Sequence, residues 1–116
     1  MIVNANVILA KCRTDRELYG MRVEECGRDW IRTWAFKIRE DMARREGFDK
    51  VFINGSFART EEYPGCPYCG GNGFIVCGVC KKISCYNGED IGVCRWCGNQ
   101  AAVEKRDRLD VKGGDF

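Results

Sequence analysis

Hydrophobic and polar residues alternate along three stretches of the first half of the chain, residues 3–9, 19–23 and 30–38. Alternation with a period of two places apolar side chains on one face of an extended chain, so each stretch predicts a β-strand. A short apolar run at 51–53 predicts a fourth strand that continues toward Phe57. We interpret the large aromatic residues of the third stretch as core, because a small domain needs them for burial.

Residues 39–46 interrupt this alternation and predict one short helix. Glu40 and Asp41 lie where the helix dipole is positive, and Arg44 and Arg45 lie where it is negative. Gly47 is a suitable end, because glycine adopts a positive φ at little steric cost. Together these elements predict an α+β fold: a small antiparallel sheet with one short helix, followed by a cysteine-rich zinc-ribbon hairpin.

Nine cysteines are an unusually high number for a chain of 116 residues. Cys12 and Cys26 lie in the first 65 residues, and the others fall between positions 66 and 97. Cysteines at this density form disulfides or bind metal. The first residues have no basic segment before an apolar run, so they do not resemble a secretory signal. We therefore expect a reducing, cytoplasmic location, where thiols bind metal more readily than they pair.

Most of these cysteines form three Cys-x-x-Cys units: Cys66/Cys69, Cys77/Cys80 and Cys94/Cys97. Two intervening residues let both sulfurs of a tight turn face one point, and N–H groups in the turn can donate to the thiolates. Glycine follows the first and third units and permits the left-handed conformation that closes such a turn. Between the outer units, residues 74–77 and 82–86 can pair as a hairpin, which predicts a zinc ribbon.

Two closed four-cysteine sites need one ligand more than the clustered cysteines supply. We predict that Cys12 supplies it and that Cys26 is unliganded. The predicted ligands of two Zn²⁺ ions are Cys12, Cys66, Cys69, Cys77, Cys80, Cys85, Cys94 and Cys97. We assign Cys66, Cys69, Cys94 and Cys97 to one ion and Cys12, Cys77, Cys80 and Cys85 to the other. An alternative groups Cys66, Cys69, Cys77 and Cys80. Spacing does not fix the pairing, and it does not distinguish zinc from iron.

The rest of the composition argues against several functions. The chain has no histidine, which removes the commonest acid–base catalyst, and we expect that it is not an enzyme. The glycine-rich run at 70–73 follows a cysteine turn rather than a strand, so it does not predict a phosphate loop. Ligation of two Zn²⁺ ions by eight thiolates would change the net charge from +2 to about −2, which argues against nucleic-acid binding. No apolar stretch approaches the roughly 20 residues of a membrane span.

Several short motifs in the chain resemble one known family. They are Cys12, residues 19–22, residues 30–36, residues 43–47, residues 63–70 and residues 94–98. In this order they resemble the TerY-C metal-binding domain, which is typically appended to von Willebrand A domain proteins of bacterial tellurium-resistance and stress-response systems. The resemblance implies eight chelating positions and an association with signalling proteins, commonly a kinase and a phosphatase. Residues 1–116 contain no von Willebrand A domain, so we expect either a stand-alone member or a partner on another chain.

We divide the chain into a strand-rich part at 1–64, a zinc-ribbon part at 65–98 and a short charged tail at 99–116. In the tail we expect one or two helical turns between positions 101 and 109 and a frayed end at positions 113 and 114. These expectations rest on its balanced charges and its two adjacent glycines.

The expected function is that of a structural zinc-binding protein-interaction module, an accessory in a bacterial stress-response or defence signalling complex. Tyr68 and Trp96, which lie between ligands, are the candidate contact residues, although covering the metal sites explains them equally well. Two other functions remain open. One is a nucleic-acid-binding zinc ribbon, and the other is a rubredoxin-like iron electron carrier.

Overall fold

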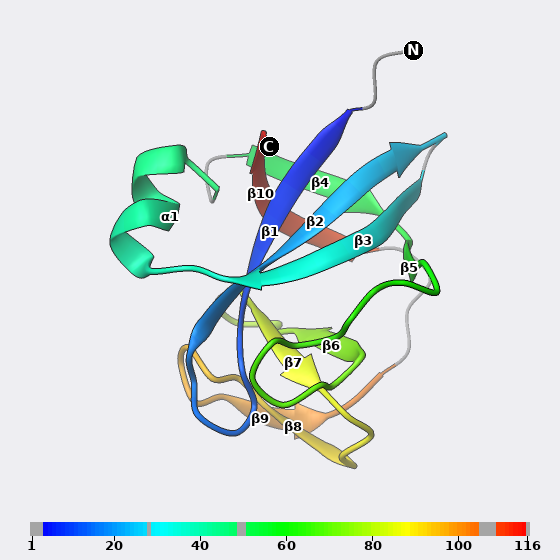
Figure 1. Ribbon diagram of the computed structural model, residues 1–116. Coiled ribbons are helices and arrows are strands. Elements are labelled where there is room, and N and C mark those ends of the chain that lie inside the picture. The colour runs from blue at the N-terminus through cyan, green and yellow to red at the C-terminus, as the bar shows by residue number, and fades with distance from the viewer. Residues whose placement is uncertain (1–3, 28, 49–50, 105–108, 116) are drawn as a thin grey trace.

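The computed structural model describes residues 4–27, 29–48, 51–104 and 109–115. Within these residues the chain is mostly β-strand, with one short helix (Figure 1). The strands are β1 (Ala5–Lys11), β2 (Leu18–Cys26), β3 (Asp29–Lys37), β4 (Val51–Gly55), β5 (Phe57–Arg59), β6 (Gly73–Val76), β7 (Ile83–Tyr86), β8 (Ile91–Val93), β9 (Gln100–Ala102) and β10 (Leu109–Asp115). The helix, α1 (Glu40–Glu46), lies between β3 and β4.

Most of the strands belong to one mixed sheet. Its main path runs β4-β10-β1-β2-β3-β5, and β7 joins it by pairing with β1, while β6 pairs with β7. β8 and β9 form a separate antiparallel pair. The predicted α+β class with a small antiparallel sheet is wrong. The sheet is larger, it contains the parallel pairs β1–β7 and β3–β5, and it includes the hairpin that we expected to follow it.

Strand β1 is the element that joins the two ends of the molecule. One edge of β1 pairs with β2 along its whole length. The other edge is divided: Asn6–Ile8 pair with β10, and Ala10 and Lys11 pair with β7. In Figure 1, β1 therefore leads from the sheet in the upper part of the view to the cysteine-rich loops in the lower part.

Both faces of β1 are buried, and this explains why its sequence is more continuously apolar than that of β2. Val7 packs on one face with Ala43 of α1 and with Phe48. Ile8 packs on the opposite face with Met21, in the larger core cluster. Because successive side chains of a strand point to opposite faces, a strand buried on both sides keeps less polar–apolar alternation, and the alternation of residues 3–6 gives way to a continuous apolar run at 7–9.

The local predictions for residues 19–23, 30–38 and 39–46 are confirmed by β2, β3 and α1. The helix ends as expected, because Gly47 has a φ of 73° and its N–H caps the last turn. The acidic and basic residues occupy the ends of α1 that the helix dipole favours. In the described residues, no helix has both the length and the apolar character that a membrane crossing requires.

The expectations for the tail are wrong where the structure describes it. Residues 101 and 102 lie in β9, not in a helix, and residues 105–108 lie outside the described residues. Gly113 and Gly114 are buried in β10, between β1 and β4, rather than frayed. A Cβ atom on Gly114 would lie 2.7 Å from the Cα of Phe48 and would also collide with the carbonyl of Gly47. Glycine is needed here because the strand lies directly against another stretch of backbone.

Candidate metal centres

Each Cys-x-x-Cys unit folds into the same five-residue turn, in which the N–H of the fifth residue donates to the carbonyl of the first cysteine. The pairs are Gly70 to Cys66 at 2.8 Å, Lys81 to Cys77 at 3.0 Å and Gly98 to Cys94 at 2.9 Å. The fifth residue has a positive φ in every case, 78°, 63° and 82° respectively. Glycine suits this conformation at two of the positions, and Lys81 adopts it despite its Cβ atom.

Backbone N–H groups inside the turns point at the sulfur of the first cysteine. In the second turn, the N–H groups of Val79 and Cys80 donate to Cys77 Sγ at 3.3 and 3.4 Å. In the third turn, the N–H groups of Trp96 and Cys97 donate to Cys94 Sγ, both at 3.4 Å. Hydrogen bonds to a sulfur favour its thiolate form, which is the form that binds metal. The second and third turns therefore position the first sulfur of each pair through two backbone N–H groups.

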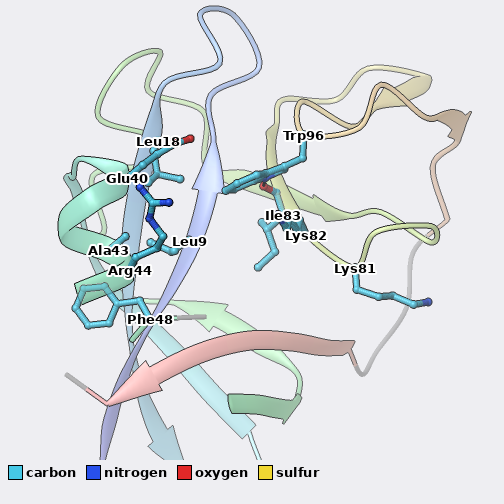
Figure 2. A pocket seen from close by; sticks show the side chains of 10 residues that line it. All are labelled: Leu9, Leu18, Glu40, Ala43, Arg44, Phe48, Lys81, Lys82, Ile83 and Trp96. Carbon is cyan, nitrogen blue, oxygen red and sulfur yellow. Dashed lines mark hydrogen bonds between the residues drawn. The ribbon is translucent and has the colours of Figure 1, made fainter. Parts of the chain in front are cut away.

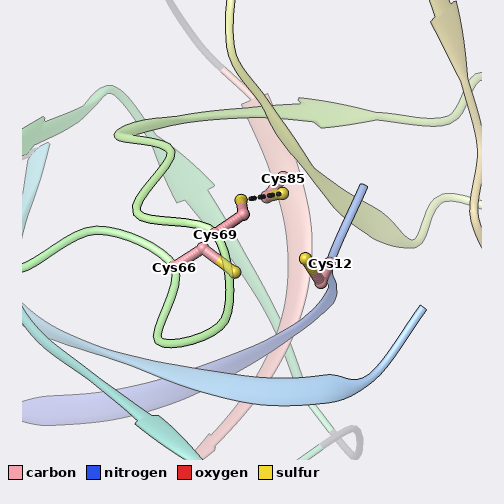
Figure 3. Close-up of side chains that lie close together, drawn as sticks. All are labelled: Cys12, Cys66, Cys69 and Cys85. Carbon is pink, nitrogen blue, oxygen red and sulfur yellow. Dashed lines mark hydrogen bonds between the residues drawn. The ribbon is translucent and has the colours of Figure 1, made fainter. Parts of the chain in front are cut away.

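Centre A consists of Cys12, Cys66, Cys69 and Cys85, whose sulfurs all lie within 4.8 Å of one another (Figure 3). Cys66 and Cys69 come from the first turn. The other two come from neighbouring strands, because the parallel register that pairs Lys11 with Ser84 places the next residues, Cys12 and Cys85, side by side. Centre A thus joins the end of β1 to the end of β7 and to the turn before β6.

Centre B consists of Cys77, Cys80, Cys94 and Cys97, again with all sulfurs within 4.8 Å of one another. The first pair lies at the tip of the β6–β7 hairpin, where Val76 pairs with Ile83. The second pair lies at the tip of the β8–β9 hairpin, where Val93 pairs with Gln100. Two hairpin tips that face each other therefore form this centre.

The sulfur geometry fits a tetrahedral metal ion. A Zn–S bond of about 2.3 Å requires neighbouring sulfurs to lie about 3.8 Å apart in a tetrahedron. The separations are 3.6 Å for Cys69 and Cys85, 3.6 Å for Cys77 and Cys97, and 3.5 Å for Cys80 and Cys94. None of these cysteines is in a disulfide. Neither group includes a carboxylate, so both offer the soft, all-sulfur donor set of a structural zinc or iron–thiolate site.

A fourth turn of the same kind surrounds Cys12. The N–H of Arg16 donates to the carbonyl of Cys12 at 3.0 Å, and Arg16 has a φ of 61°. Asp15 occupies the position of the second cysteine, but its carboxylate accepts from the N–H of Glu17 at 2.9 Å and is not part of centre A. Cys85 contributes the fourth sulfur of centre A. The pattern Cys-x-x-Asp-Arg is the sequence signal for this turn, and sequence reasoning missed it.

Comparison with known families settles the relationship that this cysteine arrangement suggests. The family model for the TerY-C metal binding domain matches residues 3–115. The chain belongs to the TerY-C metal binding domain family. The match covers nearly the whole chain, including β10, and extends beyond the residues that carried the resemblance in the sequence. No curated protein and no solved structure matches this TerY-C domain.

The eight cysteines that we predicted as ligands are brought together by this TerY-C fold, but not in the predicted pairs. The first turn joins Cys12 and Cys85 in centre A, while the second and third turns form centre B together. The alternative pairing of the first and second turns differs from the structure as well. The first and second turns lie at opposite ends of strand β6, which carries the second turn away from the first and toward the third. Cys26 is exposed and belongs to neither centre.

Polar contacts next to centre A hold the ligand-bearing segments of the TerY-C domain together. The N–H of Arg13 donates to Cys85 Sγ at 3.0 Å, and its guanidinium forms an ion pair with Glu89 at 3.0 Å. Glu89 also accepts from the N–H of Asn87 at 3.0 Å, and this bond, with a smaller contribution from the Arg13 charge, lowers the pKa of its carboxyl. Arg13 thus links the turn that contains Cys12 to the loop that follows Cys85.

The thiols of each centre differ in acidity. Burial raises the pKa of Cys66 to about 11, that of Cys80 to about 12, and that of Cys85 further still. Burial would also raise the pKa of Cys77, but the N–H groups of Cys80 and Val79 outweigh it and lower the value to about 6. Each centre therefore needs a cation to hold all its sulfurs as thiolates at neutral pH.

The two centres also differ in exposure. In centre A, Cys12, Cys66 and Cys85 are at most 2% exposed, and Cys69 is half-buried. In centre B, Cys97 is exposed to solvent. Water and small molecules therefore reach one corner of centre B directly, whereas the sheet and the core surround centre A.

Tyr68 and Trp96 each lie between two ligands and fold back onto the sheet. The hydroxyl of Tyr68 donates to the carbonyl of Leu18 at 2.9 Å, and the indole N–H of Trp96 donates to the carbonyl of Ile83 at 2.7 Å. Both side chains are half-buried. They fasten the metal-binding turns to the sheet, and each keeps part of its surface open to solvent.

Proposed function

We propose that this TerY-C domain is a structural zinc module that presents a rigid surface to a protein partner. The observation that carries the proposal is the pair of all-cysteine tetrads, each of which joins separate segments of the chain. Four thiolates close the coordination sphere of Zn²⁺ and leave no position for a substrate. Metal binding would then act on the fold itself, since the free energy of binding at such sites is free energy of folding.

Zinc is the proposed occupant of both centres, and iron is the alternative that the experiment must separate. Elemental analysis of the reduced chain should give two zinc atoms per molecule, with no absorption of visible light. One or two iron atoms, with the colour of an iron–thiolate centre, would replace this proposal with an electron carrier.

Closed coordination supports a non-enzymatic role, and it can be tested by replacing the native metal with Co²⁺. The cobalt spectrum should be that of a tetrahedral all-thiolate site, and it should stay unchanged when imidazole or cyanide is added. A spectrum that shifts on addition would reveal an open position and would favour a catalytic centre.

The cellular setting is proposed from the family resemblance. We propose a cytoplasmic accessory of a bacterial stress-response or defence signalling complex, with a von Willebrand A domain protein, a kinase or a phosphatase as its partner. The metal-loaded chain should co-elute with such a protein from the same genome in size-exclusion chromatography. The chelated chain should not. Equal co-elution with and without metal would contradict the proposal, because partner binding would then not require the metal-dependent fold.

A further inference from the structure

A groove lies between helix α1 and the loops that carry centre B (Figure 2). It has a volume of about 300 Å³, at the lower end of the range for ligand pockets. Leu9, Leu18, Ala43, Phe48 and Ile83 form its apolar lining. In Figure 2, the indole of Trp96 extends from the centre B side toward β1, while α1 and Phe48 lie on the opposite side. An apolar side chain of moderate size would fit between these walls.

Positive side chains border this apolar groove, although the Lys81 ammonium points away from it (Figure 2). Arg44, Lys81 and Lys82 line it, and none of them forms an ion pair within the described part of the chain. Glu40 is the acidic residue of the lining, and Lys11 pairs with it at 3.8 Å. The groove therefore has unbalanced positive charge around an apolar floor, although the chain as a whole carries a net charge of only +2.

The side of the groove formed by Trp96 depends on the metal-binding turns. Trp96 lies between two ligands of centre B, and Lys82 follows the turn that holds the other two. The ammonium groups of Lys11 and Lys82 each lie 4.5 Å from the centre of the Trp96 ring. Cation–π contacts of this kind hold both lysines beside the groove instead of leaving them free in solvent.

We propose that this groove binds an acidic peptide segment of the partner protein. A large apolar side chain of that segment would enter between Phe48, Ile83 and Trp96, and flanking carboxylates would pair with Arg44 and Lys82. The proposal rests on the proposed function as a protein-interaction module and specifies the chemistry of the partner. Opposite charges around an apolar anchor are a common basis of specificity in peptide recognition.

The test uses the metal-loaded full chain and a fluorescein-labelled peptide with one phenylalanine between two pairs of glutamates. Fluorescence anisotropy should show saturable binding. Replacing the glutamates with lysines, or the phenylalanine with glycine, should weaken binding by about tenfold or more. Equal binding of the glutamate and lysine peptides would overturn the proposal. Tighter binding of a labelled single-stranded oligonucleotide at the same groove would overturn it in favour of nucleic acid.

Two arginines of α1 provide a matched pair of variants. Both Arg44 and Arg45 are exposed, but only Arg44 lines the groove. Arg44→Glu should weaken binding of the acidic peptide by about tenfold, whereas Arg45→Glu should change it little. Equal effects would mean that net charge, not the groove, attracts the peptide.

Metal content and co-elution with the partner are measured on the same variants. If Arg44→Glu leaves the partner complex intact, this proposal fails and the proposed function stands; a metal-loaded chain that forms no complex contradicts the proposed function itself.

Discussion

Cys12 lies 54 positions before the next ligand of centre A, yet its sulfur lies among those of Cys66, Cys69 and Cys85. It is fully buried, and the turn around it repeats the hydrogen bonds of the Cys-x-x-Cys turns. A ligand so distant in sequence ties the strand-rich part of the chain to the cysteine-rich loops. By contrast, Cys26 is exposed at the end of β2 and far from both sulfur groups.

These two cysteines therefore make a matched test. Cys12→Ser should reduce the metal content by about one atom per chain and should lower the midpoint of thermal unfolding, because three sulfurs no longer close centre A. Cys26→Ser should leave both quantities unchanged. Metal analysis by mass spectrometry under native conditions, together with calorimetry, measures them. Normal metal content in the Cys12 variant would remove this residue from the ligand set.

The pKa of each cysteine thiol determines how metal binding depends on pH. Bound metal holds the thiols as thiolates, so their pKa values in the loaded protein lie below those in the unfolded chain. The stability they contribute is present at high pH and is lost as the pH falls. Without metal, burial raises the pKa of Cys66 to about 11 and that of Cys85 even further, so at least these two thiols of centre A are protonated at neutral pH.

Metal binding at centre A should therefore release at least two protons. The apparent affinity should fall by about a hundredfold for each unit of pH below neutrality, since each released proton contributes a factor of ten. Competition titrations with a chromogenic chelator at several pH values measure this slope. A slope near zero would show that the thiols are already ionised before metal binds.

At the scale of elements, local patterns predict the local structure well. Alternation identifies β2 and β3, charge placement and Gly47 identify α1, and the hairpin of β6 and β7 follows from the spacing between turns. Local sequence patterns do not predict which distant segments pair with each other. The parallel pairing of β1 with β7 joins residues more than 70 positions apart, and that pairing decides which cysteines share an ion. The sequence consequently nominated eight cysteines that the structure gathers into two sulfur groups, but it did not predict which four lie together.

Strand β10 was missed for a different reason. Two adjacent glycines usually indicate a flexible segment, but here Gly113 and Gly114 allow a strand to lie directly against the backbone after α1. Gly114→Ala should lower the free energy of unfolding by about 1–3 kcal/mol, because the added Cβ collides with backbone that cannot move aside.

Gly78 provides the control for this change. It has no neighbouring atom within 4 Å of an added Cβ, and its φ is not in the left-handed region. Gly78→Ala should therefore change the stability little. Urea unfolding of the metal-loaded variants, followed by circular dichroism, compares the two. Similar midpoints for both variants would contradict the close contact of β10 with Phe48.

At the scale of the whole molecule, the two centres occupy different surroundings. The core encloses centre A, which joins three separate parts of the chain, whereas centre B joins two hairpin tips and has one exposed ligand, Cys97. Ligand exchange requires access of an incoming molecule to the metal, so exposure should govern the rate of release.

Excess chelator should therefore remove the metal in two phases, first from centre B and then from centre A. Cys97→Ser should accelerate or abolish the first phase and preserve the second, while most of the sheet remains folded. Cys66→Ser should instead unfold much of the chain. Release measured by stopped-flow absorbance, with circular dichroism in parallel, separates these cases. Simultaneous loss of both ions would show that the centres behave as one unit.

The position of β10 between β1 and β4 has a consequence for synthesis on the ribosome. Translation produces β1 first, but one edge of its first half gains its neighbour only when residues 109–115 have emerged. β4, which pairs with β10 in the sheet order, must wait for the same residues. From the synthesis of β1 until residues 109–115 emerge, the nascent chain thus carries an unpaired strand edge, the kind of feature that promotes aggregation before folding is complete.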